Sequence, residues 1–367
     1  MGVSTSSRTA AGSSLWNHIA AAASTTYLHN VIMRRAGTRD NVGDALLLRG
    51  LGGPAGSPRQ PEHVSIPGDA KGRTSAAPRA GFQERGALAP LLFLALLGAC
   101  ARDTAVDFTI TMERGGHTRT AQVHLPPAVD GGAPLPVVFN FHGYTATGQQ
   151  QADYSALNTV ADELGFATVH ANGVHRSWNG GACCGRAQGQ DVDDVGFVDA
   201  LLEELPRNFS VDPRRVYATG MSNGAFLSYR LACERANRFA AIVTVAGVNG
   251  MASCVPARPV PLLHFHGTLD RLVDYQGTTF VGVRASVEQW PGRMGCTTAA
   301  RETFRQGDAV CETFDPCNGG AEATLCTIEE GGHTWPGAAY VPGLGRVTQE
   351  LNASRKALEF FARFSLP

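Results

Sequence analysis

Apolar runs that end in glycine or in polar residues recur along the chain from residue 106 onward. The arms VDFTITM and TRTAQVHL flank a turn at 113–117 and predict a hairpin, because apolar residues alternate along the second arm. The continuous apolar run PVVFNFHG at 136–143 is typical of a strand buried on both faces. Further patterns predict helices at 151–164, 194–206 and 223–237, and strands at 166–173, 215–220, 240–247 and 261–267. The alternation predicts an α/β fold with a mostly parallel, doubly wound sheet.

The C-terminal part continues with a helix after residue 283, then three short β-like runs. These are TAARETF, AVCETF and ATLCTIEE. A closing helix within 348–364 places Leu351, Ala357 or Leu358, and Phe361 on one face. No long insertion interrupts the strands, so the sequence predicts one domain over 101–367 with no large lid and an open site.

Residues 1–86 differ from this pattern, because they are rich in Gly, Ala, Ser, Arg and Pro and lack sustained periodicity. They are interpreted as a disordered leader or a mis-assigned start. The run ALAPLLFLALLGAC at 87–100 is too short to span a bilayer and suits the apolar part of an export signal; the alternative is a buried core helix. Its end resembles a bacterial lipobox, which makes Cys100 a candidate for lipidation. The expected location is extracellular, or lipid-anchored in a bacterial cell envelope, with membrane contact only through Cys100.

Charge and cysteine content narrow the function classes. The chain has 31 basic and 32 acidic residues without a basic run, which disfavours a nucleic-acid partner. Nine cysteines point away from a reducing cytosol, and eight remain for four bridges once Cys100 is set aside. Paired C-x-x-C motifs are absent from the sequence, and Cys183 and Cys184 are adjacent, a poor geometry for two ligands on one ion. Neither a metal nor a cofactor is expected, and the sequence carries no signal for an oligomeric state.

The pentapeptide GMSNG at 220–224 matches the G-x-S-x-G pattern of a nucleophile elbow. The match alone is weak in a chain with 43 glycines, where a structural serine on a turn is the alternative. A predicted strand precedes it and a predicted helix follows it, which is the context that the motif requires. Ser222 is therefore the candidate nucleophile.

A serine nucleophile needs a base and a group that orients the base. In α/β-hydrolases the acid and then the histidine follow the serine along the chain. Asp270 comes after a late predicted strand and is the candidate acid, with Asp274 as its rival. His333, on a glycine-rich loop after the last predicted strand, is the candidate base.

The other motif histidines, His142, His264 and His266, all precede Asp270 and break this order. They are interpreted as structural; His264 and His266 could bind a metal, but no third ligand accompanies them at a sensible spacing. For an oxyanion, the expected donors are the main-chain N–H groups of Tyr144 and Asn223.

Six motifs together resemble the polyhydroxybutyrate depolymerase and feruloyl esterase family of secreted α/β-hydrolases, of the carbohydrate-esterase 1 type. They are HG at 142–143, RSWN with CCG at 176–185, DDVGF at 193–197, GMSNGA, HGTLD and GGHTWPG. The resemblance covers about 105–365 and gives Ser222, Asp270 and His333 the nucleophile, acid and base roles. It also implies that Trp178 and Trp335 contact substrate.

The resemblance further implies that Asp193 and Asp194 are structural and cap a helix at 195–206. A carboxylate pair for glycosidase chemistry is the alternative. Placing the cysteines along the predicted elements suggests four disulfides: Cys233 with Cys254, Cys296 with Cys317, Cys311 with Cys326, and Cys183 with Cys184.

The sequence thus predicts an exported serine ester hydrolase that forms an acyl-enzyme. The expected substrates are polymer-borne esters, either polyhydroxyalkanoates or feruloyl and acetyl esters of polysaccharides. A serine peptidase of the same fold and a catalytically silent surface-binding module are the rival hypotheses.

Overall fold

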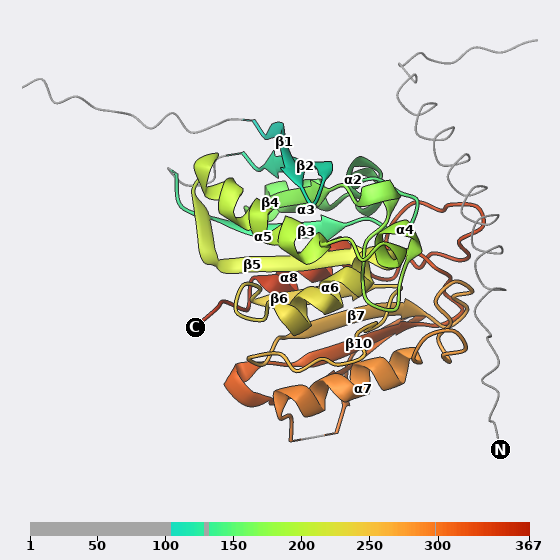
Figure 1. The fold of residues 1–367 in the computed structure, drawn as a ribbon. Coiled ribbons are helices and arrows are strands. Elements are labelled where there is room, and N and C mark those ends of the chain that lie inside the picture. The colour runs from blue at the N-terminus through green and yellow to red at the C-terminus, as the bar shows by residue number, and fades with distance from the viewer. Residues whose placement is uncertain (1–103, 128–131, 298) are drawn as a thin grey trace, which may run out of the picture. The chain divides into compact units, whose positions relative to one another are not determined.

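A ten-stranded sheet organises the computed structural model, which describes residues 104–127, 132–297 and 299–367. The strands are β1 Val106–Arg114, β2 His117–Leu125, β3 Leu135–Phe141, β4 Ala167–Ala171, β5 Val211–Met221, β6 Ala241–Val245, β7 Leu262–Gly267, β8 Arg301–Gln306, β9 Ala309–Phe314 and β10 Ala323–Ile328. Their order is β1-β2-β4-β3-β5-β6-β7-β10-β9-β8 (Figure 1). Six neighbouring strands are parallel: β4, β3, β5, β6, β7 and β10. The outer strands β1, β2, β9 and β8 pair antiparallel. This arrangement confirms the predicted α/β-hydrolase fold.

Helices cover both faces of the sheet. They are α2 Gly148–Ser155, α3 Leu157–Leu164, α4 Gly185–Gly189, α5 Asp194–Glu204, α6 Asn223–Glu234, α7 Val283–Met294 and α8 Ala353–Phe361, with short 3₁₀ turns η1 Val174–Arg176, η2 Leu205–Arg207 and η3 Asn318–Gly320. Side chains of α5, α6 and α7 belong to one hydrophobic cluster, and those of α3 and α8 belong to another. Neighbouring residues on a strand point to opposite faces, so Phe139 joins the first cluster and Val138 the second.

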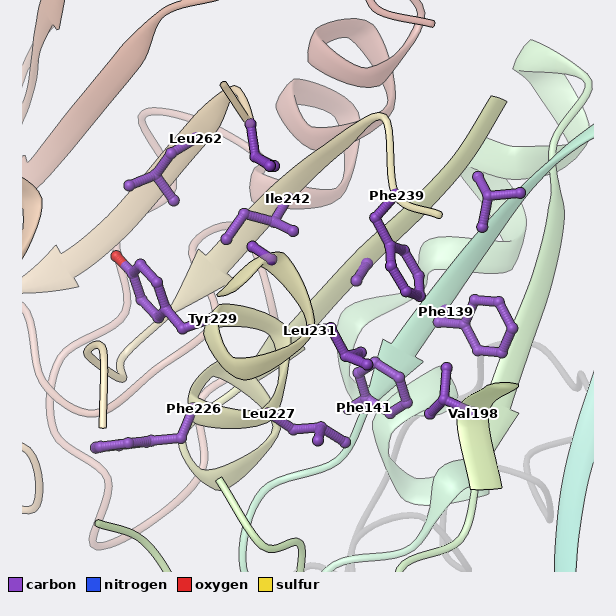
Figure 2. Close-up of a cluster of buried hydrophobic side chains, with 14 of the residues drawn as sticks. Phe139, Phe141, Val198, Phe226, Leu227, Tyr229, Leu231, Phe239, Ile242 and Leu262 are labelled. Atoms are coloured by element: carbon purple, nitrogen blue, oxygen red, sulfur yellow. The ribbon is translucent and has the colours of Figure 1, made fainter. Parts of the chain in front are cut away.

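The α6 helix is anchored deep in the first cluster (Figure 2). Its Leu227 and Leu231 are fully buried and lie near Phe139 and Phe141 of β3. The Phe139 ring also meets Phe239 edge to face, with centroids 6.0 Å apart. Burial of large side chains on both sides of the contact fixes α6 on the sheet. This also fixes Ser222, the single residue between the end of β5 and the start of α6.

Several predicted boundaries are corrected by the structure. The helix expected at 151–164 is two helices, α2 and α3, which are separated at Ala156 in a left-handed conformation with φ of 49°. The closing helix starts only at Ala353, where the Asn352 side chain accepts a hydrogen bond from Arg355 N. The helices predicted at 194–206 and 223–237 end at Glu204 and Glu234.

All four predicted disulfides are present: Cys183–Cys184, Cys233–Cys254, Cys296–Cys317 and Cys311–Cys326. The last bridge joins directly opposite residues of β9 and β10. Within the described ranges, no helix is long and apolar enough to cross a membrane. The expectations for residues 1–86, the export segment 87–100 and lipidation of Cys100 lie outside the described residues.

Candidate active site

Ser222 sits on a sharp turn between β5 and α6. Its backbone has φ of 54° and ψ of −121°, a conformation that non-glycine residues adopt rarely and that is often found at functional sites. Ser222 N donates a 2.8 Å hydrogen bond to Val245 O of β6, which holds the turn in place. A Cβ atom on Gly220 would lie 2.7 Å from Phe141 O, and one on Gly224 would overlap the same carbonyl. The strand, turn and helix around the motif therefore have the tight geometry that a nucleophile elbow requires.

Asp270 and His333 meet on two neighbouring loops. Asp270 follows β7, and His333 follows the adjacent parallel strand β10. His333 Nδ1 lies 2.7 Å from Asp270 Oδ2. Main-chain hydrogen bonds of 2.9 Å from Thr268 N to Ile328 O and from Leu269 N to Gly331 O join the two loops.

The rival acid, Asp274, has a different environment. Its two carboxylate oxygens accept hydrogen bonds of 3.2 Å from Gln276 N and Thr278 N, which close a local turn. The structure therefore pairs His333 with Asp270 and gives Asp274 a role in the loop.

Four donors surround the Asp270 carboxylate. Besides His333, Asp270 Oδ1 accepts from Leu272 N at 2.8 Å and from Val273 N at 2.9 Å, and His266 Nε2 lies 3.2 Å from Oδ2. Burial raises the pKa of Asp270, but the charge and hydrogen bond of His333 and the hydrogen bond of His266 outweigh it, so the pKa is lowered overall. The carboxylate is thus kept ionised beside the histidine.

The three side chains are well covered. Ser222, Asp270 and His333 are 6%, 3% and 5% exposed. Each follows a strand of the parallel set, at the same edge of the sheet, where ligands of open α/β sheets bind. The three side chains are therefore held by the protein interior rather than standing free on the surface.

The loop after β3 lies next to the elbow, since a Cβ atom on Gly143 would be 3.5 Å from Ser222 Cβ. The loop that carries Tyr144 therefore begins beside the serine. His142 holds the loop: its Nε2 accepts from Gly173 N at 3.0 Å, so its Nδ1 carries the hydrogen that bonds Gly143 O at 2.8 Å. Burial lowers the pKa of His142 to about 4 and keeps this ring neutral.

The Asn223 side chain fixes the segment that carries Trp178. Asn223 Oδ1 accepts from Trp178 N at 2.6 Å, and Nδ2 donates to Trp178 O at 2.9 Å. The indole is fully buried and donates to His142 O at 3.0 Å. Trp335 is 1% exposed, and its Nε1 donates to Ser354 Oγ at 3.1 Å. The two tryptophans expected to contact substrate are thus buried in the interior. There Trp178 bonds to the main chain after β3, and Trp335 ties the His333 loop to α8.

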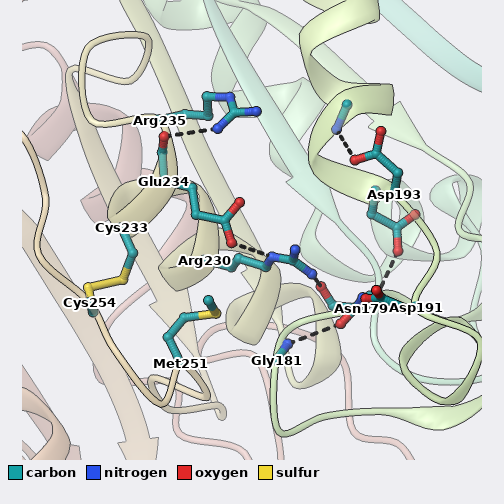
Figure 3. Close-up of polar contacts among 12 residues, drawn as sticks. Asn179, Gly181, Asp191, Asp193, Arg230, Cys233, Glu234, Arg235, Met251 and Cys254 are labelled. Atoms are coloured by element: carbon teal, nitrogen blue, oxygen red, sulfur yellow. Dashed lines mark hydrogen bonds and ion pairs between the residues drawn. A yellow bond between two sulfur atoms is a disulfide. The ribbon is translucent and has the colours of Figure 1, made fainter.

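A polar network around Asn179, the residue after Trp178, was not predicted from the sequence. Arg119 of β2 and Asp194 of α5 form a buried ion pair of 2.7 Å, and Asp194 Oδ2 accepts from Asn179 N at 2.7 Å. Arg230 of α6 donates to Asn179 O at 2.9 Å (Figure 3). Asp193 caps α5 by accepting from Gly196 N, so the structural interpretation of the acidic pair holds.

The chain is similar to known esterases. Residues 120–258 match the family described as Esterase PHB depolymerase. Over these residues the chain is similar to the esterase PHB depolymerase family. It is 31% identical over 235 residues to feruloyl esterase B of Piromyces equi, across 59% of this chain and 42% of that protein. It is 29% identical over 292 residues to putative esterase NocK of Nocardia uniformis subsp. tsuyamanensis, across 71% of this chain and 84% of that protein.

Among solved structures, acetyl xylan esterase from Aspergillus awamori aligns with a TM-score of 0.49 and 15% identity, over 62% of this chain and 94% of that one. The chain spans less than half of the feruloyl esterase. The family match contains Ser222 and Asn223 but ends before Asp270 and His333. The assignment of the acid and the base in this PHB depolymerase relative therefore depends on their geometry.

Proposed function

We propose that this chain is an exported carboxylic-ester hydrolase that uses Ser222, His333 and Asp270 as a catalytic triad. The observation that carries the proposal is the 2.7 Å contact between His333 Nδ1 and Asp270 Oδ2, at the sheet edge where Ser222 occupies the elbow. With Nδ1 bonded to a carboxylate, His333 Nε2 is left as the acceptor that a serine hydroxyl needs.

The mechanism follows from these positions. Ser222 Oγ attacks the ester carbonyl while its proton passes to His333 Nε2, and Asp270 stabilises the imidazolium that forms. The main-chain N–H groups of Asn223 and Tyr144 donate hydrogen bonds to the developing oxyanion. The proton then goes to the departing alcohol, and a water molecule activated by His333 releases the acid from Ser222.

Export is supported by the cysteines. All eight cysteines of the described ranges are paired in disulfides, and such bonds persist in oxidising compartments. The export segment at 87–100, with or without a lipid on Cys100, would deliver the chain there.

Polymer-borne esters are the proposed substrates. The family description names PHB depolymerase, and relatives bear the names feruloyl esterase and bifunctional acetylxylan esterase/xylanase. Polyhydroxyalkanoates and feruloyl or acetyl esters of polysaccharides therefore head the list of substrates to test.

Labelling with a fluorophosphonate tests the nucleophile. Wild type is expected to be labelled on Ser222, and Ser222→Ala is expected to lose both the label and the hydrolysis of p-nitrophenyl esters. Ser253→Ala, a change at an exposed loop serine, is the matched control and should keep both. An unlabelled wild type would overturn the proposal, and faster turnover of peptide anilides than of esters would favour the peptidase alternative.

A further inference from the structure

Two buried histidines of β7, His264 and His266, take no part in the steps above. They are 0% and 2% exposed, and their rings stack with centroids 5.3 Å apart. Residues two apart on a strand point to the same face, so the strand itself aligns the two rings. The line of the rings leads to Asp270.

His266 faces two oxygens that can only accept hydrogen bonds. Its Nε2 lies 2.8 Å from Val273 O and 3.2 Å from Asp270 Oδ2. A carbonyl and an ionised carboxylate have no hydrogen to give, so Nε2 of His266 must carry one. In the neutral ring, Nδ1 is then an acceptor.

His264 supplies the donor for that acceptor. Its Nε2 lies 3.1 Å from His266 Nδ1, which places a hydrogen on His264 Nε2 and leaves His264 Nδ1 as an acceptor. Two hydroxyls, Thr244 Oγ1 at 2.8 Å and Tyr229 OH at 3.1 Å, can donate to that Nδ1. Burial, and then the neighbouring His266, lower the pKa of His264 well below its usual value, which agrees with a neutral ring.

We propose that His266 is a positioning residue, which with His264 forms a one-way chain of donors from the hydroxyls of β6 and α6 to the Asp270 carboxylate. The inference rests on the proposed function, because it assigns the chain to the acid of the triad. Aligned donors polarise one another in a buried site. The chain holds Oδ2 toward His333 and keeps Asp270 ionised.

The donor set around Asp270 explains why orientation depends on His266. Main-chain N–H groups fix only Oδ1, whereas Oδ2 is shared between His333 and His266. Without the donor on His266, only the His333 ring would hold Oδ2. The ionisable groups that face this cluster are Asp270, His333, His264, Tyr229 and Tyr275, whose ring meets His266 edge on.

Ester hydrolysis by two variants tests the role. His266→Leu is expected to lower kcat on the order of 10- to 100-fold with little change in KM, because the carboxylate loses its orientation. It should also move the acidic limb of the kcat/KM profile to higher pH, because that limb reports protonation of the triad base, and a carboxylate with one donor fewer holds a proton on that base more strongly. His266→Gln can place an amide N–H near the position of Nε2 and is expected to recover most of both effects.

His170→Leu is the matched control, because His170 is also buried in a parallel strand but bonds to Asn158 and Thr168 instead. It should leave the acidic limb in place even if stability falls. Equal losses in the Leu and Gln variants of His266, or the same limb shift in His170→Leu, would overturn the inference.

Histidine ¹⁵N NMR gives a readout that does not need esterase activity. The rings of His264 and His266 are each expected to carry the hydrogen on Nε2 and to leave Nδ1 as an acceptor. A hydrogen on Nδ1 of either ring would reverse the donor chain and overturn the proposal. A wild type that is not labelled by fluorophosphonate and does not hydrolyse esters would instead overturn the proposed function. In that case the histidine tautomers would still show whether the chain of donors runs from His264 to Asp270.

Discussion

At the scale of single residues, the two acidic side chains after β7 should respond very differently to substitution. Asp270→Asn is expected to lower kcat/KM by about three to four orders of magnitude, because an amide no longer stabilises the imidazolium or fixes its tautomer. Asp274→Asn is expected to stay within about threefold, since an asparagine oxygen can still accept in the turn. Kinetics with p-nitrophenyl butyrate on the two purified variants check this, with thermal melting to confirm folding. Comparable losses would reassign the acid.

The sequence is sufficient to choose the residues of the proposed triad, whereas it does not show which residues support them. Ser222, Asp270 and His333 stand in motifs whose chain order is itself informative. The ion pair between Arg119 and Asp194 joins residues 75 positions apart, and no local pattern marks it. Burial of Trp178 likewise depends on such distant contacts, so its interior position could not be predicted.

At the scale of elements, the space around two glycines, one in the elbow and one in α7, predicts opposite effects of changing each to alanine. Gly224→Ala places a Cβ against Phe141 O, so it should destabilise the fold by more than about 2 kcal/mol and abolish activity. Gly292→Ala, in α7 with open space around it, should stabilise by about 0.5–1 kcal/mol and leave activity unchanged. Urea unfolding of both variants measures the difference, and a tolerated Gly224→Ala would contradict the tight packing at the turn.

The break between α2 and α3 shows why element boundaries were harder to predict than elements. The segment around Ala156 contains no proline or glycine, so its local pattern reads as one helix. In the fold, Ser155 O accepts a 2.6 Å hydrogen bond from Ser354 Oγ, 199 residues away, and Ser155 Oγ bonds Asn140. Partners brought together by the fold override the local preference here.

At the scale of the whole molecule, buried neutral histidines should make the protein sensitive to acid. Burial lowers the pKa of His142 to about 4 and that of His170 to about 3, against about 6.5 in the unfolded chain. Because the folded pKa is the lower one, the unfolded state binds protons first as the pH falls. The contribution of these neutral rings to the free energy of unfolding is therefore complete above pH 6.5 and is lost progressively toward pH 4.

The expected loss is several kcal/mol by pH 4, because one pKa unit corresponds to about 1.4 kcal/mol. Urea unfolding at pH 7.5, 5.5 and 4.5 measures it, and His170→Leu should give a shallower decline than wild type. An unfolding free energy that stays constant from pH 7.5 to 4.5 would show that these rings are protonated in the folded protein.

The antiparallel strand β8 has a consequence for how molecules of this protein meet one another. It ends the sheet, and its residues Arg301, Glu302 and Arg305 are exposed. A second sheet that added a strand there would have to strip water from these charges, which is costly. The charges on β8 thus disfavour pairing of two sheets through this edge.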